Sequence, residues 1–162
     1  MFAQNKHLYL IEQVQELKEG VRSGTNNIDL SYNHPCKELI WVIRSANNSC
    51  FEFVDANGRN PLTSALIKLN GHDRLSERMG NYFNLVQPFA HHTRIPIDTG
   101  INVFSFGMRP EKLHPMGTCN MSRMDNSQLI MNSSESGTLY VWATNYNVLK
   151  IAGGMGGVLF SN

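Results

Sequence analysis

The sequence lacks the features that mark membrane-spanning and secreted chains. No run approaches the roughly 20 consecutive apolar residues that a membrane-spanning helix needs, and no basic segment followed by an apolar core opens the chain. The formal net charge is +1, and the fourteen lysines and arginines are scattered. A protein that grips nucleic acid needs a basic patch to neutralise phosphates. We therefore expect a soluble protein, without membrane insertion and without direct contact to nucleic acid.

Cysteine is scarce, and the three cysteines lie far apart at Cys36, Cys50 and Cys119. Without a Cys-x-x-Cys pair, the sequence offers neither a zinc-knuckle pattern nor a redox motif. Free cysteines are among the most buried side chains. We expect three buried free thiols, which suits assembly in a reducing cytoplasm.

Motifs of catalysis and metal binding are also missing. His91 and His92 are adjacent, and neighbours on a strand point to opposite faces, so they do not chelate one ion together. Asp55–Gly58 begins like a calcium loop, but the remaining ligands do not follow and position 64 is Ser. Gly153–Gly157 lacks the Lys-Ser/Thr of a phosphate loop. The sequence therefore predicts no enzyme, no metal and no cofactor, and we interpret the two glycine-containing stretches as turns or bends.

Four charged residues near position 75 invite a catalytic reading, because an acid, a base and a cation follow Gly71 in succession. No Gly-x-Ser-x-Gly elbow accompanies them, and His72 has no nucleophile partner in the sequence. The simpler interpretation is an ion-pair network that holds a long loop or bridges to a neighbouring subunit. Its members would be Asp73, Arg74, Glu77 and Arg78.

Short apolar runs separated by Gly, Asn, Ser and Pro dominate the chain, and this pattern is typical of an all-β domain. Asn57-Gly58 and Asn70-Gly71 are tight-turn dipeptides. About eight strands in 162 residues suit one two-sheet sandwich. The expected strands are residues 8–15, 27–32, 37–44, 62–69, 101–107, 128–132, 138–151 (with a bend or break) and 158–161.

Aromatic residues lie mostly inside or beside these strands, so we expect most of them in the core and a few at subunit contacts. A surface for stacking sugars or bases is the alternative. The residues concerned are Trp41, Phe51, Phe53, Tyr82, Phe83, Phe89, Phe104, Phe106, Tyr140 and Trp142. Three Asn-x-Ser sequons, at Asn47, Asn120 and Asn132, are expected to be unused in a protein made outside the secretory pathway.

Three segments, in the same order, resemble the major capsid proteins of the nucleocytoplasmic large DNA viruses, which carry two jelly rolls in tandem. Residues 69–93 read LNGHDRLSERMGNYFNLVQPFAHHT, residues 33–43 read NHPCKELIWVI, and residues 145–162 read NYNVLKIAGGMGGVLFSN. The resemblance covers residues 10–162. It implies an eight-stranded jelly-roll β-sandwich with long inter-strand loops and at most short helical turns.

The resemblance also bears on the first segment. Leu10, Val14, Leu17 and Val21 fall at helical spacing, and propensity alone predicts a helix over residues 8–19. Because the family places its first strand here, we predict a strand through Gln15 followed by a loop. Short helical turns are expected near residues 75–79 or 82–85.

The sequence resembles only the second, C-terminal jelly roll of the family, so residues 1–162 are expected to form a single domain. In the family, three copies of the double jelly roll make a pseudo-hexagonal capsomer, and capsomers tile an icosahedral shell. The resemblance thus implies a structural subunit of the virion capsid, assembled in the host cytoplasm. Its partners would be itself, as a trimer or pseudo-hexamer, and other capsid proteins such as a full-length double jelly-roll paralogue.

Contacts between subunits are expected in the connections 71–100 and 107–127, because long loops on a rigid scaffold carry specificity. The candidate interface residues are Arg74, Arg78, Tyr82, Phe83, His91, His92 and Arg94. Two other functions stay open at this point. A lectin-like binding module would bind sugars as a stable monomer, and a cupin-like metalloenzyme would carry bound metal.

Overall fold

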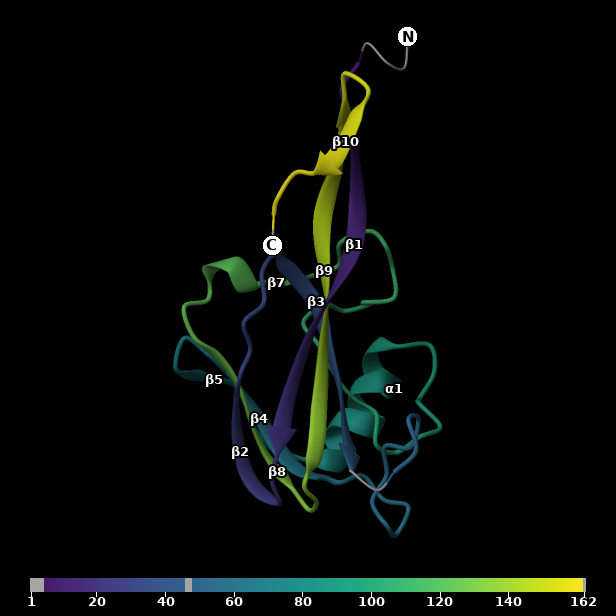
Figure 1. The fold of residues 1–162 in the computed structure, drawn as a ribbon, viewed down its shortest axis with the longest axis vertical. Coiled ribbons are helices and arrows are strands. Elements are labelled where there is room, and N and C mark those ends of the chain that lie inside the picture. The colour runs from purple at the N-terminus through teal and green to yellow at the C-terminus, as the bar shows by residue number, and fades with distance from the viewer. Residues whose placement is uncertain (1–4, 46–47, 162) are drawn as a thin grey trace.

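The computed structural model describes residues 5–45 and 48–161, and antiparallel β-sheets dominate them (Figure 1). The first sheet has the strand order β1-β9-β3-β6, with the short strand β10 beside β9 and the short strand β7 beside β3. The second sheet has the order β2-β8-β4-β5. Strands that follow one another along the chain mostly alternate between the two sheets, which is the connectivity of a jelly roll.

The strands and helices have the following bounds. The strands are β1 (His7–Val21), β2 (Gly24–Asp29), β3 (Pro35–Ser45), β4 (Leu62–Leu69), β5 (His72–Met79), β6 (Asn102–Ser105), β7 (Cys119–Asn120), β8 (Ser127–Ser133), β9 (Gly137–Ala152) and β10 (Met155–Val158). The helical turns are the π-helix η2 (Tyr82–Val86), the α-helix α1 (Gln87–His91) and the 3₁₀-helix η3 (Met121–Arg123). The four strands in line in each sheet thus agree with the predicted eight-stranded jelly roll, and the short strands β7 and β10 bring the first sheet to six strands.

The core lies between the two sheets and follows the two-residue period of the strands. On β9, Leu139, Val141 and Ala143 are fully buried, whereas Tyr140 and Trp142 on the other face are half-buried. The buried hydrophobic residues that pack together in this core are Val21, Ile28, Leu30, Tyr32, Cys36, Leu39, Trp41, Ile43, Leu62, Ala65, Ile67, Phe83, Phe104, Met121, Leu129, Met131, Leu139, Val141 and Ala143. Side chains from both sheets therefore form one continuous core.

Strands β1 and β9 form a long ribbon that the sequence predicted only in part. They pair from His7 opposite Ile151 to Val21 opposite Gly137 without a break. The predicted loop after Gln15 is therefore wrong, and so is the bend or break expected in 138–151. The helical spacing in this segment has no effect, because a full ladder of hydrogen bonds to β9 stabilises the extended conformation.

Strand β5 is a second correction, since its residues were expected to belong to a loop. β5 pairs with β4 alone and is mostly exposed, so it is an edge strand. Edge strands carry charged side chains that discourage pairing with other chains. These charges replace the alternation of apolar and polar residues by which a strand is recognised in a sequence. The turn before it is the predicted one: Asn70 and Gly71 have φ angles of 52° and 78°, as a two-residue hairpin requires.

The end of the chain forms a hairpin. Its last strand, β10, lies earlier than the strand predicted at 158–161. Gly153 and Gly154 have φ angles of 60° and 79°, and they turn the chain so that β10 runs back along β9. The strand that was expected at 27–32 likewise lies earlier, at Gly24–Asp29. Both displacements reflect ladder partners that local sequence does not identify.

The connection between β5 and β6 holds two of the helical turns, η2 and α1. The turn predicted near 82–85 is confirmed by η2, whereas residues 75–79 belong to β5. Phe83 is fully buried, and its ring lies 5.1 Å from that of Trp41. The connection is therefore packed onto the core and is not a free loop.

Candidate assembly surface

One end of the molecule is drawn out into a narrow extension, at the top of Figure 1. The extension consists of residues 7–12 of β1, residues 147–152 of β9 and the whole of β10, and we call it the arm. β10 takes the side of β9 opposite β1, beyond the point where β3 ends its pairing at Cys36. The arm is therefore a three-stranded ribbon that continues the first sheet past the sandwich.

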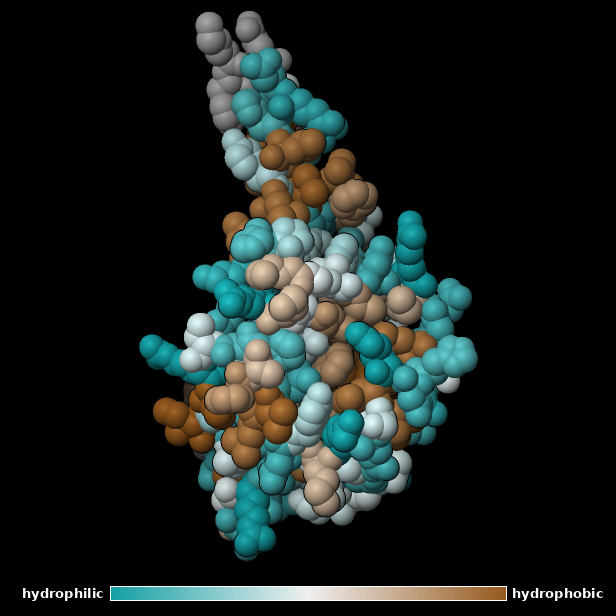
Figure 2. Space-filling model, turned by 180° about the vertical axis from the view of Figure 1, so that it is seen from behind, coloured by the Kyte–Doolittle hydropathy of each residue, from teal (hydrophilic) through white to brown (hydrophobic). Residues whose placement is uncertain are grey.

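The arm exposes large apolar side chains, which Figure 2 shows as brown patches on the narrow part of the molecule. On β1 these are Leu8, Tyr9 and Leu10, with exposed fractions of 52%, 47% and 42%. On β10 they are Met155 and Val158, with exposed fractions of 76% and 47%. Contiguous exposed apolar patches mark interaction sites more often than chance solvent-facing residues do. The arm is the strongest candidate for a contact surface.

Buried amides fix the base of the arm to the sandwich. The Asn145 side chain donates to Gln15 Oε1 at 2.6 Å and to the Asn33 carbonyl at 2.7 Å. The Asn147 side chain donates to Gln13 Oε1 and to the Phe160 carbonyl, each at 2.8 Å. Both asparagines are almost fully buried. Buried amides that are hydrogen-bonded specify one register, so the arm has a defined direction.

A buried lysine reinforces the same region. The Lys37 ammonium is paired with the Glu12 carboxylate, donates to the Lys112 carbonyl at 2.9 Å, and lies 5.1 Å from the centre of the Tyr146 ring. Only 3% of the Lys37 side chain is exposed. A charge so buried is retained only with partners, so the loop around Lys112 is held against β3 and β1.

The candidate interface residues of the β5–β6 connection divide into buried and exposed groups. Phe83 lies in the core, so the expectation that it contacts another subunit does not fit the structure. The Tyr82 ring is half-buried, and its hydroxyl accepts a hydrogen bond from Gln87 Nε2 at 2.8 Å. The Arg78 guanidinium lies 5.6 Å from the centre of the Tyr82 ring. Arg78 is exposed, as are Arg74 and Arg94, and these three cations are available for contacts.

The two histidines of this connection make separate contacts within the chain. His92 Nε2 lies 2.7 Å from Glu38 Oε2, and only 13% and 10% of the two side chains are exposed. His91 Nδ1 lies 3.1 Å from the Met108 carbonyl. Their side chains therefore diverge, and His92 fastens the end of α1 to β3.

A further link joins this connection to the loop after β6. The backbone N–H and the hydroxyl of Thr93 both donate to Glu111 Oε1, at 3.1 Å each. The hydrogen bond from the Thr93 backbone is the main reason that the pKa of Glu111 lies below its usual value. The two loops proposed from sequence as contact regions are thus fastened to each other.

The ion-pair network expected among the charged residues near position 75 does not form. Asp73 pairs instead with Lys68 on β4, at 3.7 Å. Glu77 accepts hydrogen bonds from Ser64 and Asn132, at 2.6 Å and 3.3 Å. Alternation along β5 and the pairing with β4 direct these side chains toward neighbouring strands rather than toward one another.

The thiols differ from the expectation of three buried groups. Cys36 is buried and its Sγ lies 3.2 Å from the Glu38 carbonyl, whereas Cys119 is half-buried and Cys50 is exposed. Burial raises the pKa of Cys36 strongly, and it also raises the pKa of Cys119. The prediction for Cys50 is wrong because this residue lies in the surface loop between β3 and β4. Its side chain is not part of a strand that faces the core.

The expectation that most aromatic residues lie in the core is met in part. Trp41, Phe83 and Phe104 are buried, but Phe51 and Phe89 are 87% and 79% exposed. The Asn132 side chain is engaged by hydrogen bonds with Thr25, Ser64 and Glu77. Asn120 is half-buried. Asn47 lies outside the described residues.

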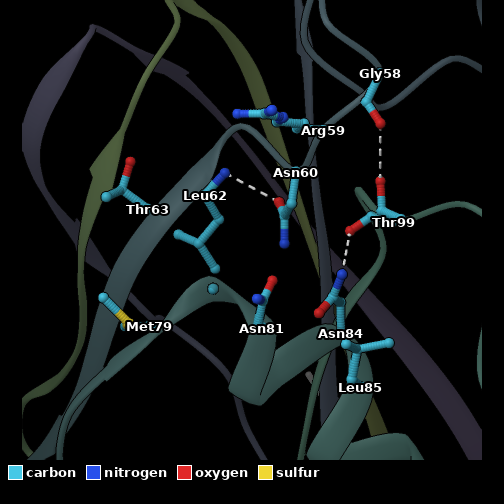
Figure 3. Close-up of a pocket in the computed structure, with 11 residues that line it drawn as sticks. Gly58, Arg59, Asn60, Leu62, Thr63, Met79, Asn81, Asn84, Leu85 and Thr99 are labelled. Carbon is cyan, nitrogen blue, oxygen red and sulfur yellow. Dashed lines mark hydrogen bonds between the residues drawn. The ribbon is translucent and has the colours of Figure 1, made fainter.

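A hollow of about 470 Å³ lies where the β3–β4 loop meets η2 (Figure 3). Asn84 forms part of its wall and donates from Nδ2 to the Thr99 carbonyl at 2.8 Å, while the Leu62 backbone N–H donates to Asn60 Oδ1 at 3.0 Å. The described residues that line it include no histidine, carboxylate or thiol.

The described residues form neither a cluster of metal ligands nor a membrane-spanning helix. Across residues 5–45 and 48–161, no three His, Cys, Asp or Glu side chains gather in a way that could hold a metal ion. In the same part of the chain, no helix is both long enough and apolar enough to cross a membrane.

The fold places the protein in a structural class. The chain superposes on a PBCV-1 virus capsid chain with a TM-score of 0.89 and 29% identity, covering 99% of this chain and 53% of that one. It is also similar in fold to the Faustovirus major capsid protein, with a TM-score of 0.80 and 15% identity, over 90% of this chain and 34% of that one. The class is that of the jelly-roll proteins of viral capsids.

Sequence comparison then gives the family. The model of a family described as the large eukaryotic DNA virus major capsid protein matches residues 1–157. The chain belongs to this family. It is 55% identical to the major capsid protein of Chrysochromulina ericina virus, over 99% of this chain and 50% of that protein. It is 42% identical to that of Pyramimonas orientalis virus, over 99% of this chain and 45% of that protein. The chain spans about half the length of these relatives.

Proposed function

We propose that this chain is a structural subunit of an icosahedral virion shell and not a catalyst. Family membership over residues 1–157 is the observation that carries the proposal. A rigid sandwich with a defined arm suits a building block, because symmetry multiplies modest interfaces between identical parts into a closed lattice. The three free cysteines suit assembly in a reducing compartment such as the host cytoplasm.

We further propose that the chain corresponds to the second of two jelly rolls, and that the arm is where the first one docks. The relatives are about twice as long as this chain, and the structure holds one jelly roll. Burying Leu8, Leu10 and Met155 against another domain would remove their apolar surface from water. Each Å² of apolar surface buried in this way stabilises the contact by about 25 cal/mol. A jelly roll packed there, from the same polypeptide or from a full-length paralogue, would supply that cover.

Lateral contacts between capsomer subunits are proposed for β5 and for the connection that follows it. Arg74, Arg78 and Arg94 are exposed there, and Tyr82 presents part of its ring beside Arg78. Arginine and tyrosine are enriched at protein interfaces. His91 and His92 face their own chain, so we assign them to holding the connection in place.

Sedimentation velocity over a concentration series tests the proposal. We expect the chain to associate to a trimer or hexamer. Leu10→Glu should weaken this association at least tenfold, because it would bury a charge in any contact made through the arm. Val14→Glu is the matched control, since Val14 is 64% exposed and lies on β1, outside both the arm and the proposed lateral contacts. A wild-type chain that stays monomeric at every concentration, alone and when mixed with a full-length relative, would contradict a role in shell assembly.

A further inference from the structure

The solvent-facing side of the first sheet carries an aromatic pair that the shell role does not use. The rings of Tyr140 and Trp142 project from the same face of β9, with centres 5.9 Å apart and planes only 13° from parallel. Both residues are half-buried, so part of each ring meets solvent. Aromatic residues on the outer face of a sandwich contribute nothing to the core between its sheets. Their arrangement therefore calls for another account.

Neighbouring strands hold the two rings in place. The cationic groups of Lys18 on β1 and Arg44 on β3 lie 5.5 Å and 5.3 Å from the centre of the Tyr140 ring. Trp142 Nε1 donates to the Glu16 carboxylate at 2.8 Å. Contacts of this kind restrict ring rotation. The two rings thus form a fixed shelf, whose conformational entropy is already lost before any ligand arrives.

A hollow of about 200 Å³ lies beside this shelf. Phe51 and Phe53 of the β3–β4 loop line its other side, and Arg44 is the one charged side chain among the described lining residues. Ligand pockets for drug-sized molecules are larger, at roughly 300–1,000 Å³. The hollow therefore has room for a single ring, while the neighbouring part of a longer ligand would extend along the outer face of the sheet.

The Arg44 guanidinium decides the charge that such a ligand would carry. Within the described residues it pairs with no carboxylate: the ion pairs there join Lys37 to Glu12, Lys68 to Asp73, and His92 to Glu38. A guanidinium presents a planar fork of donors that matches a carboxylate. The hollow thus combines flat apolar surface with a guanidinium that no carboxylate among the described residues matches.

From this geometry we propose that the Tyr140–Trp142 shelf binds a β-linked glycan of gluco configuration that carries uronic acid residues. All ring substituents of such a sugar are equatorial, so each face presents only axial C–H groups, which pack on an aromatic ring. Arg44 receives the carboxylate. A nucleic acid also stacks on aromatic rings, but it needs a basic groove along its backbone, and here the cations are only Lys18 and Arg44 at the Tyr140 ring, with Arg44 the one that lines the hollow among the described residues. The proposal is independent of the role of the chain in a shell.

Tryptophan fluorescence gives a direct first test, because the chain has two tryptophans and Trp41 is fully buried. A change in emission on adding ligand therefore reports on Trp142. The probes are the β-1,4-linked hexamer of glucuronic acid and cellohexaose, which share length and linkage but differ in the carboxylate. We expect a saturable change with the acidic hexamer, with a Kd below about 1 mM, and binding of cellohexaose at least fivefold weaker.

Calorimetric titration of variants then identifies the site. Trp142→Ala is expected to weaken binding of the acidic hexamer at least tenfold, and Arg44→Gln is expected to remove the preference for the acidic over the neutral hexamer. Phe89→Ala is the matched control, since Phe89 is an exposed aromatic on α1, and it should leave both affinities unchanged. No saturable binding of either hexamer, equal binding of the two, or an equal loss in the Phe89 variant would overturn the proposal.

Discussion

The burial of Phe83 makes a quantitative prediction, because sequence had placed this residue at a subunit contact. Its side chain is fully buried, with the Trp41 ring at 5.1 Å and the Tyr82 ring at 5.2 Å. Truncating a buried phenylalanine to alanine costs about 3–5 kcal/mol, through lost transfer free energy and the cavity that remains. We therefore expect Phe83→Ala to destabilise the chain by that amount.

This loss of stability converts to a fall in the melting temperature, Tm. An unfolding entropy of about 2.1 cal/mol/K per residue over 162 residues means that each kcal/mol lowers Tm by about 3 °C. Phe83→Ala should thus lower Tm by about 9–15 °C in thermal unfolding followed by circular dichroism.

Phe89→Ala is the control for this experiment, because Phe89 belongs to the same connection but is 79% exposed. A surface truncation changes stability by no more than about 0.5 kcal/mol, so its Tm should move by less than about 2 °C. If Phe83→Ala lowered Tm no more than Phe89→Ala does, the connection between β5 and β6 would not be part of the core, and the reasoning would be refuted.

Three further predictions concern the latch at His92, the thiols and the final hairpin. Glu38→Ala leaves the His92 ring without its partner in a mostly buried position, so it should lower the free energy of unfolding, measured with urea, by about 1–3 kcal/mol. Glu38→Gln keeps a hydrogen-bonding group and should lower it by less. Equal losses in the two variants would argue against the contact. A thiol reagent at pH 8 should modify Cys50 first and Cys36 only on unfolding, because burial raises the pKa of Cys36 and so lowers its thiolate fraction; mass spectrometry after a time course checks the order, and early labelling of Cys36 would contradict its burial. Gly154→Val places a β-branched residue at a φ of 79°, so amide hydrogen exchange in β10 should accelerate while exchange in the sandwich does not; unchanged protection of β10 would count against the hairpin.

Sequence alone predicted the jelly-roll class and most of its strands. The alternation of Leu139, Val141 and Ala143 with Tyr140 and Trp142 is a local pattern, and it identified the strand but not which of its two faces enters the core. The tight turn at Asn70-Gly71 was equally local, because that dipeptide favours positive φ at both positions. The three segments that resemble the viral capsid proteins identified the family, which the match over residues 1–157 shows.

The features of the candidate sites depended on contacts between distant residues, so sequence could not supply them. The buried amides of Asn145 and Asn147 bond to residues far away in the chain, and so does His92, which contacts Glu38. Arg44 likewise lines its hollow together with residues of β9. Strand β5 escaped notice because one-sided pairing removes the need for alternation.

What the sequence by itself determined is therefore the set of strands whose side chains alternate, the turns between them and the family, because each depends on residues that are neighbours along the chain. The tertiary structure decided that β1 and β9 extend past the sandwich as the arm, that Phe83 enters the core, and that Tyr140 and Trp142 meet Phe51 across a hollow. Register and packing are set by partners that approach only when the two sheets close on each other. The exposed surfaces are what remains after that closure.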